Sequence, residues 1–504
     1  MASDPTLRRL RQLRRDQRAQ SKSDLRYTIY VALMVLLIVG VPVIRMAILG
    51  LASPEIVAFV VSAAAPAVLS AVTGLLIAAL VVLGRIRGPA LVDPFRSAIV
   101  ASNHLPRSQT LLRPFLVSTT QLVGVLVALA LVLSAALAVA GAASALSVVV
   151  FVAATVLVGI LAGIAWLGGQ SLPPRSSQRI AAALAAVSLT GAVIPGGLLL
   201  TPWGWVALLY PSSGLAPWLA LAGLAIAVLA ASLVVPKLLD GIRGSELNAQ
   251  AQRWTSAATF TASADLAGAF EQFRALPTVG RQWRAVQVVP TPILMLARDV
   301  IGSLRTPERT ILAALSLTVA GFLLASISAV PATVAWAPAL LGGVIAFLAL
   351  GVWSDGFRHA ADAAVALPLY GFGVAKEIAL HATLPVVGVL VFVGAGALTA
   401  LAVGASPVSV VVALAFVLFI VTVRVMAATK GQMPLELLTP IPTPGGDFSG
   451  ALVMMWQADA LLLTGVLSLA LTTSWLSTPV LLAVIPVAAV IVLAIARHNL
   501  ANAR

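Results

Sequence analysis

The chain has 504 residues, of which 60% are hydrophobic and 10% carry a charge, and its formal net charge at pH 7 is +14. Since about 25% of the residues of a soluble domain are charged, this composition excludes a typical water-soluble protein. The sequence contains no cysteine, which excludes disulfide bonds and thiolate metal sites.

The first 26 residues form a polar, arginine-rich segment without the features of a cleavable signal peptide. Leucines at positions 7, 10 and 13 stand among arginines, a pattern typical of a helix that lies on anionic lipid. We therefore expect residues 1–27 to form a cytoplasmic arm on the membrane surface. The arginines assigned to that surface are Arg8, Arg9, Arg11, Arg14 and Arg15.

Long hydrophobic stretches recur from residue 28 onward. Each has about 18 residues or more, enough for a helix to cross a bilayer core of about 30 Å. The sequence therefore predicts an all-α polytopic membrane protein with about 12 transmembrane helices. The predicted spans are 28–50, 57–84, 114–140, 146–168, 180–200, 215–235, 310–330, 337–353, 383–403, 407–426, 449–470 and 478–496.

All 31 Lys and Arg residues except Arg45 fall on one side of these spans, in the N-terminal arm and in alternate loops. Because positively charged loops stay in the cytoplasm, both termini and every long loop are expected there. The positive charge thus indicates topology rather than a nucleic-acid partner. Arg far outnumbers Lys, as in chains from GC-rich bacterial genomes, so we expect the bacterial cytoplasmic (inner) membrane.

Two polar segments share Asp, Phe, Arg, Ala, Ala, Leu and Pro at identical spacing, and their numbering differs by 262. The copies are Asp93–Pro106 and Asp355–Pro368, and the short cytoplasmic loops with Gly169-Gln170 and Gly431-Gln432 follow the same offset. We interpret the repetition as an internal duplication.

The duplication divides the chain into four parts. Residues 1–27 are the arm, 28–235 a first half of six transmembrane helices, 236–309 a cytoplasmic linker that ends in a second interfacial helix, and 310–504 a second half of six. Because each half has an even number of spans, we expect two parallel repeats related by an axis along the membrane normal, with a pathway between them.

Each copy of the polar motif predicts a short amphipathic helix, with its Asp as the N-cap and its Leu-Pro pair at the end. One interpretation is a helix that rests on the membrane surface. The other is a docking helix for a cytoplasmic partner, which repetition at equivalent positions favours. The motif residues are Asp93, Phe95, Arg96, Leu105 and Pro106 in the first half and Asp355, Phe357, Arg358, Leu367 and Pro368 in the second.

No segment offers a site that could drive transport by itself. None of the 17 Asp and Glu and none of the four His lies in the middle of a predicted span, which weakens coupling to an ion gradient. The sequence also lacks a Gly-Lys-Ser/Thr phosphate loop, a metal-ligand cluster and a catalytic triad. We therefore expect a transporter, not an enzyme, with no cofactor in this chain and a separate ATPase.

Four segments resemble ABC-2-type exporter permeases, in particular the large duplicated permeases of actinobacterial type. These segments are Leu105 to Arg113, Leu367 to Lys376, Pro202-Trp-Gly-Trp205 and Trp456 to Leu463. The second loop departs from the first, because Leu369 and Tyr370 replace Arg107 and Ser108.

The resemblance implies the membrane-spanning permease subunit of an ATP-driven ABC exporter. Two copies of a nucleotide-binding subunit, which would hold the ATP and Mg²⁺, are expected to dock near 93–113 and 355–376. Arg107 and Lys376 then join the motif residues in coupling to the ATPase. A hydrophobic or amphipathic cargo, such as a lipid, a peptide or an antibiotic, is expected, because the spans are rich in Ala, Val, Leu and Gly.

Two other functions stay open. A major-facilitator-type secondary carrier also has twelve spans and a long central cytoplasmic segment, and Gly351 to Arg358 mimics its loop signature. That family needs a tight basic loop, however, and here about 30 residues intervene before the next span. A polyprenyl-linked transferase would carry catalytic residues in long outer loops, whereas the predicted outer loops are short.

Overall fold

The computed structural model of the chain divides into two compact units, Met1–Gln250 and Ala251–Arg504. The described residues are 30, 33–34, 36–62, 64–102, 106–194, 196–210, 217–262, 268–269, 272–273, 279–280, 282–284, 289–332, 334–365, 371–431, 433–439, 441–443, 446–447, 449–472 and 478–502.

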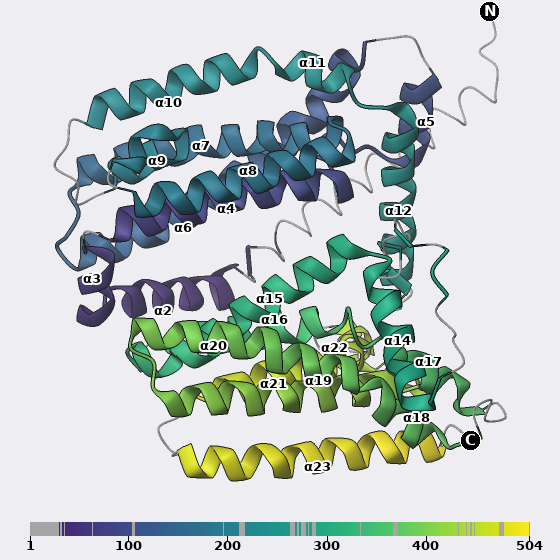
Figure 1. Cartoon of the computed structure of the whole chain (residues 1–504). Helices are drawn as coiled ribbons and strands as arrows, with labels where there is room; N and C mark the ends of the chain where they lie inside the picture. The colour runs from purple at the N-terminus through teal and green to yellow at the C-terminus, as the bar shows by residue number, and fades with distance from the viewer. Residues whose placement is uncertain are drawn as a thin grey trace, which may run out of the picture. The chain divides into compact units, whose positions relative to one another are not determined.

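The first unit is built around α7 (Ala145–Ser171), which packs against α4 (Ala65–Ile86), α6 (Arg107–Val139) and α10 (Pro217–Ser232) (Figure 1). Helix α8 (Pro174–Val193) lies against α4. The remaining elements are η1 (Leu36–Gly40), α2 (Val41–Leu51), α3 (Pro54–Val60), α5 (Pro94–Ser102), η2 (Gly197–Leu200), α9 (Pro202–Leu208), α11 (Val235–Asp240) and the start of α12 (Gly244–Ala262).

The second unit is built around α21 (Pro407–Ala428), which packs against α16 (Trp336–Leu350), α20 (Gly394–Ala400) and α23 (Thr478–Asn502). Helix α22 (Ser449–Ala470) lies against α16. The remaining elements are α14 (Thr291–Leu304), α15 (Pro307–Ser326), η3 (Ile327–Ala329), α17 (Asp355–Asp362), η4 (Ala363–Val365), α18 (Val374–His381), α19 (Thr383–Gly388), η5 (Val389–Val393), η6 (Leu401–Val403), η7 (Leu435–Leu438) and the paired strands β1 (Pro442–Thr443) and β2 (Gly446–Asp447).

Within the described ranges, nine helices are long and apolar enough to cross a membrane. They are Ala65–Ile86, Arg107–Val139, Ala145–Ser171, Trp218–Asp240, Pro307–Ala329, Val374–Ala400, Pro407–Ala428, Ser449–Ala470 and Val480–Ala501. A tenth results if α16 and α17, bent by 57° at the break between them, count as one span. This architecture agrees with the predicted all-α, multi-pass membrane protein.

Several predicted spans differ from the helices, and span 337–353 falls on α16, which reaches spanning length only together with α17. The described part of span 28–50 gives only the short apolar helix Leu36–Leu51. Span 180–200 falls on α8 and η2, and α8 opens with polar residues from Arg175 to Arg179, which lower its hydropathy. Span 383–403 lies in a helix that already begins at Val374, so His381 is inside it.

Helices α7 and α21 begin in the same way. The side chain of Ser144 accepts a hydrogen bond from the backbone N–H of Ser147 (3.1 Å), and that of Ser406 accepts one from Ser409 (3.2 Å). A serine N-cap satisfies a backbone N–H that the helix itself leaves unpaired. The numbering of the two pairs differs by 262, the offset of the polar motifs.

Glycines allow two helix pairs to approach closely. A Cβ on Gly169 of α7 would lie 2.0 Å from the carbonyl oxygen of Val81 in α4, and one on Gly396 of α20 would lie 1.8 Å from that of Thr318 in α15. Small residues at such crossings are typical of helices packed in a membrane, where close backbone contact supplies the attraction.

A π-turn, η5, interrupts the long helical segment of the second unit between α19 and α20, whereas α6 is a continuous α-helix. Both segments end near a glycine in the left-handed region, Gly141 with φ +72° and Gly404 with φ +90°. Glycine suits this conformation because it lacks a Cβ.

Candidate functional site

The candidate site comprises the polar end of each unit. In the first unit this end lies where the loop from α4 to α5 meets neighbouring helices, and in the second where the turn from α16 to α17 does so. In the first unit two buried glutamines organise this end. The side-chain carbonyl of Gln170 accepts a hydrogen bond from the backbone N–H of Ala90 (3.1 Å), and its amide donates to the Oε1 atom of Gln250 (3.1 Å). Gln250 in turn donates to the carbonyls of Gly84 (3.2 Å) and Arg85 (3.0 Å) at the end of α4. The network fixes α4, α7 and the start of α12 to the loop that leads into α5.

Helix α5 has an N-cap, and one of its faces is bonded to α12. The backbone N–H of Arg96 donates to Oδ1 of Asp93 (3.0 Å), so Asp93 is the predicted cap, and the two side chains also form an ion pair at 3.2 Å. Ser97 is fully buried and donates to Oδ1 of Asn248 in α12 (2.9 Å). Phe95, on the opposite face, is 75% exposed.

The start of α6 is tied to the end of α11. Asp240 accepts hydrogen bonds from the backbone N–H (2.7 Å) and the hydroxyl (3.2 Å) of Ser108. The guanidinium of Arg107 donates to the carbonyl of Ile242. A carboxylate at a helix N-terminus satisfies orphan N–H groups and suits the positive end of the helix dipole. Pro106 is the exposed residue just before α6.

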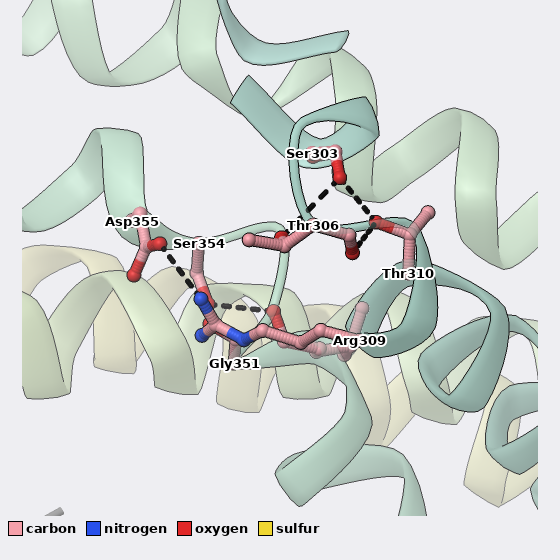
Figure 2. A network of polar contacts seen from close by, with 8 residues as sticks. Ser303, Thr306, Arg309, Thr310, Gly351, Ser354 and Asp355 are labelled. Atoms are coloured by element: carbon pink, nitrogen blue, oxygen red, sulfur yellow. Dashed lines mark hydrogen bonds and ion pairs between the residues drawn. The ribbon is translucent and has the colours of Figure 1, made fainter. Parts of the chain in front are cut away.

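In the second unit, α17 carries the second copy of the motif, and its aromatic residue is buried in the unit. Asp355 is the first residue of α17 and not its cap, a position that Ser354 occupies. The carboxylate of Asp355 pairs with Nη1 of Arg309 in α15 (3.3 Å). Arg309 also donates to the carbonyl of Gly351 (3.4 Å), as Figure 2 shows. Phe357 is fully buried in the hydrophobic core of this unit. Arg358 is exposed on the other side of α17.

A half-buried acid and a buried histidine meet beside α17. Oδ2 of Asp299 in α14 lies 2.6 Å from Nδ1 of His381 in α18. The His381 side chain is 1% exposed, and its Nε2 atom has no hydrogen-bond partner among the described residues. A Cβ on Gly356 would lie 2.4 Å from Nδ1 of His381, so the glycine lets α17 reach the imidazole.

Two further cations are held at this end. Arg424 donates to the carbonyl of Phe347 through Nε (2.9 Å) and stacks on its ring, with the guanidinium carbon 3.7 Å from the centroid. Nζ of Lys430 lies 2.6 Å from Oδ2 of Asp459 and 4.0 Å from the ring centre of Trp456. Burial lowers the pKa of the Lys430 ammonium, and the hydrogen bond with Asp459 opposes that shift.

The other predicted residues are placed as follows. Lys376 lies in α18, 5.1 Å from the ring centre of Phe372. Gly169 and Gln170 lie in the last turn of α7 and not in the following loop, because the glycine packs on α4. Gly431 follows α21 with φ +75°. The predicted residues outside the described ranges are Arg8, Arg9, Arg11, Arg14, Arg15, Leu105, Leu367, Pro368 and Gln432.

Sequence reasoning missed several residues of these polar ends, because they come from the segment assigned to a linker. Gln250, Asp240 and Asp299 all contact side chains far away in the sequence. One signal was present: Asp299 follows the hydrophobic Met295 by four residues in a segment expected to be helical, and residues four apart share a helix face.

In the described part of the chain, no group of three or more metal-ligating side chains comes together. The polar ends instead offer ion pairs, buried amides and the exposed side chain of Phe95, and their polar contacts fix the positions of neighbouring helices. Comparisons with protein-family models, with curated proteins and with solved structures gave no match.

Proposed function

We propose that this chain is the membrane-spanning permease subunit of an exporter that separate cytoplasmic ATPase subunits drive, and that its cargo is hydrophobic or amphipathic. In this proposal the chain lies in the bacterial inner membrane with both termini in the cytoplasm. It comprises two six-helix repeats of the same membrane orientation, and ATP and Mg²⁺ bind to the partner.

The order of the helices supports two repeats. In the first unit α4, α5, α6, α7, α8 and α10 follow one another, and in the second α16, α17, the segment from α18 to α20, α21, α22 and α23 do so. The central helices α7 and α21 also have corresponding neighbours. With the apolar helix at Leu36–Leu51 in the first unit and α15 in the second, each repeat has six spans when α8 and α16 are included.

The observation that carries the proposal is the short helix after the second span of each repeat, α5 and α17. Each is fixed by polar contacts to the end of its own unit, through Ser97 and Asn248 in one and through Asp355 and Arg309 in the other. A helix held in this way can transmit the movement of a bound ATPase subunit to the spans beside it. An ATP-driven permease requires such a connection.

The proposal is tested by purifying the tagged full-length chain from its native membranes. We expect a protein with a Gly-Lys-Ser/Thr phosphate loop to co-purify and the preparation to hydrolyse ATP. In vesicles, this preparation should move a fluorescent phospholipid probe only when ATP is supplied. Purification without any ATPase, combined with probe movement under a proton gradient alone, contradicts the proposal.

The second candidate is a proton-coupled carrier, and the pair of Asp299 and His381 favours it. An ionisable group buried near a span, as His381 is, is expensive and is typical of proton pathways. Under this alternative, Asp299→Asn abolishes uptake driven by a pH gradient while the protein stays folded. Under the exporter proposal, the same variant retains ATP-driven transport.

A further inference from the structure

The two motif helices differ in what covers their aromatic residue. Phe95 of α5 is 75% exposed, whereas Phe357 of α17, at the same place in the motif, is 0% exposed. Burying a phenylalanine side chain stabilises a protein by about 1.5–3 kcal/mol. In the second unit the chain itself supplies this burial, because α17 packs against α18 and α21.

The ion pairs of the two motif acids differ in the same way as the burial of the two phenylalanines. Asp93 pairs with Arg96 of its own helix, and among the described residues it has no hydrogen bond or ion pair with another element. Asp355 pairs with Arg309 of α15 and so links α17 to that span. Helix α17 thus uses both the aromatic and the acidic residue of the motif, Phe357 and Asp355, inside its own unit.

One face of α5 contacts α12, and the opposite face is exposed. Ser97 contacts Asn248, and Ala101 packs against Gly244, where an added Cβ would lie 2.9 Å from the Cβ of Ala101. Phe95 and Ile99, one turn apart on the other side, are 75% and 42% exposed. Residues four apart form one ridge on a helix, so these two side chains present a continuous apolar surface.

The charge of α5 favours a protein over the membrane as the occupant of this surface. A helix that lies on anionic lipid carries an excess of Lys and Arg on its polar face. Helix α5 has Arg96 as its single basic residue, and Asp93 neutralises it in an ion pair. A groove on a partner protein with apolar walls therefore fits Phe95 and Ile99 better than a headgroup layer does.

We infer that the two repeats are unequal, and that the ATPase docks on the Phe95 and Ile99 ridge of α5 whereas α17 serves as an internal brace without a docking face. This inference rests on the proposed function. It implies that the two ATPase subunits contact the chain through different surfaces, although the motif is repeated.

The test places a photo-reactive phenylalanine analogue at position 95 or 99 of the full-length chain, in native membranes. Matched controls carry it at His359 and Asp362, which are exposed on α17. After irradiation, mass spectrometry identifies the adducts, and an ATPase is recognised by its phosphate loop. We expect ATPase adducts at 95 and 99 and far fewer at 359 and 362, because a photo-reactive side chain forms adducts with the groups that it contacts.

A second measurement uses surface substitutions that leave the buried anchors intact. The double variant Phe95→Ser, Ile99→Ser should reduce ATPase co-purification more than about tenfold, as the loss of apolar anchors does. The double variant His359→Ser, Asp362→Ser should leave it within about twofold.

The outcomes separate the inference from the function on which it rests. Equal ATPase adducts on α5 and α17 overturn the inequality and leave the ATP-driven permease standing. Adducts at position 95 only to lipid, or only to another part of this chain, overturn the docking surface even if an ATPase co-purifies. Absence of any ATPase from both the adducts and the purified wild type overturns the proposed function and the inference with it.

Discussion

Gln170 offers the sharpest test of how the polar end of the first unit is held. Its side chain is 3% exposed and bridges the backbone N–H of the fully buried Ala90 to the amide of Gln250. Gln170→Leu keeps the approximate volume but removes both hydrogen bonds. The N–H of Ala90 and the Oε1 atom of Gln250 are then left buried without these partners.

The expected cost follows from these two groups. A hydrogen bond contributes about 1 kcal/mol net, and an unsatisfied buried donor or acceptor costs about 1–3 kcal/mol. Gln170→Leu should therefore lower the free energy of unfolding by about 3 kcal/mol. In a unit of this length, each kcal/mol shifts the melting temperature by about 2–4 °C, which gives a fall of about 6–12 °C.

The assay is thermal unfolding of the detergent-solubilised protein for Gln170→Leu, Gln250→Leu and the double variant. Since the two amides bond to each other, the double variant should be less destabilised than the sum of the singles, with a coupling of about 0.5–3 kcal/mol. Ser171→Ala is the matched control, because Ser171 follows Gln170 and, within the described ranges, its hydroxyl bonds only to Gly168 of its own helix. Additive effects, or a loss in Gln170→Leu no greater than in Ser171→Ala, refute the network as the element that holds this end.

Three further predictions concern the second unit. Gly396→Ala places a methyl group against a carbonyl of α15 and should destabilise the protein by about 1–3 kcal/mol, whereas Gly124→Ala, with nothing within 4 Å of the added Cβ, should be close to neutral in the same melting assay. Asp299→Ala should lower the melting temperature more than Asp299→Asn, because only the asparagine can still bond to His381; equal losses would show that the pair contributes no hydrogen bond. Burial lowers the folded-state pKa of Lys430 below its unfolded value of 10.5, so folding stability should rise as the pH increases from the lowered pKa to that value, and denaturation curves of Lys430→Gln should lack this rise.

The membrane architecture could be predicted from the sequence because long apolar stretches are sufficient to indicate spans. Val374 shows the limit of that reasoning: the helix begins there, before its most apolar part, because tertiary contacts of His381 stabilise the polar first turns. The same limit applies to α8, because the predicted span begins at residue 180 whereas the helix already begins at Pro174 with polar residues.

The candidate site could be predicted in part, for a physical reason. The cap formed by Asp93 depends on residues three apart, so the sequence reveals it. The ion pair of Asp355 with Arg309 and the bond of Gln170 to Gln250 join distant segments, and no local pattern encodes them. The burial of Phe357 depends on neighbours in the same way, which is why two matching motifs predict two equal surfaces.

The π-turn η5 has a consequence for the history of the chain if its halves descend from one ancestor. A π-turn accommodates one extra residue in a helix. The left-handed glycines that follow, Gly141 and Gly404, are accordingly 263 positions apart, one more than the motif offset. The capping serines just beyond them, Ser144 and Ser406, return to 262, because the second turn is one residue shorter. An insertion in the helix and a deletion in the turn thus cancel, and the start of α21 keeps the register of its counterpart.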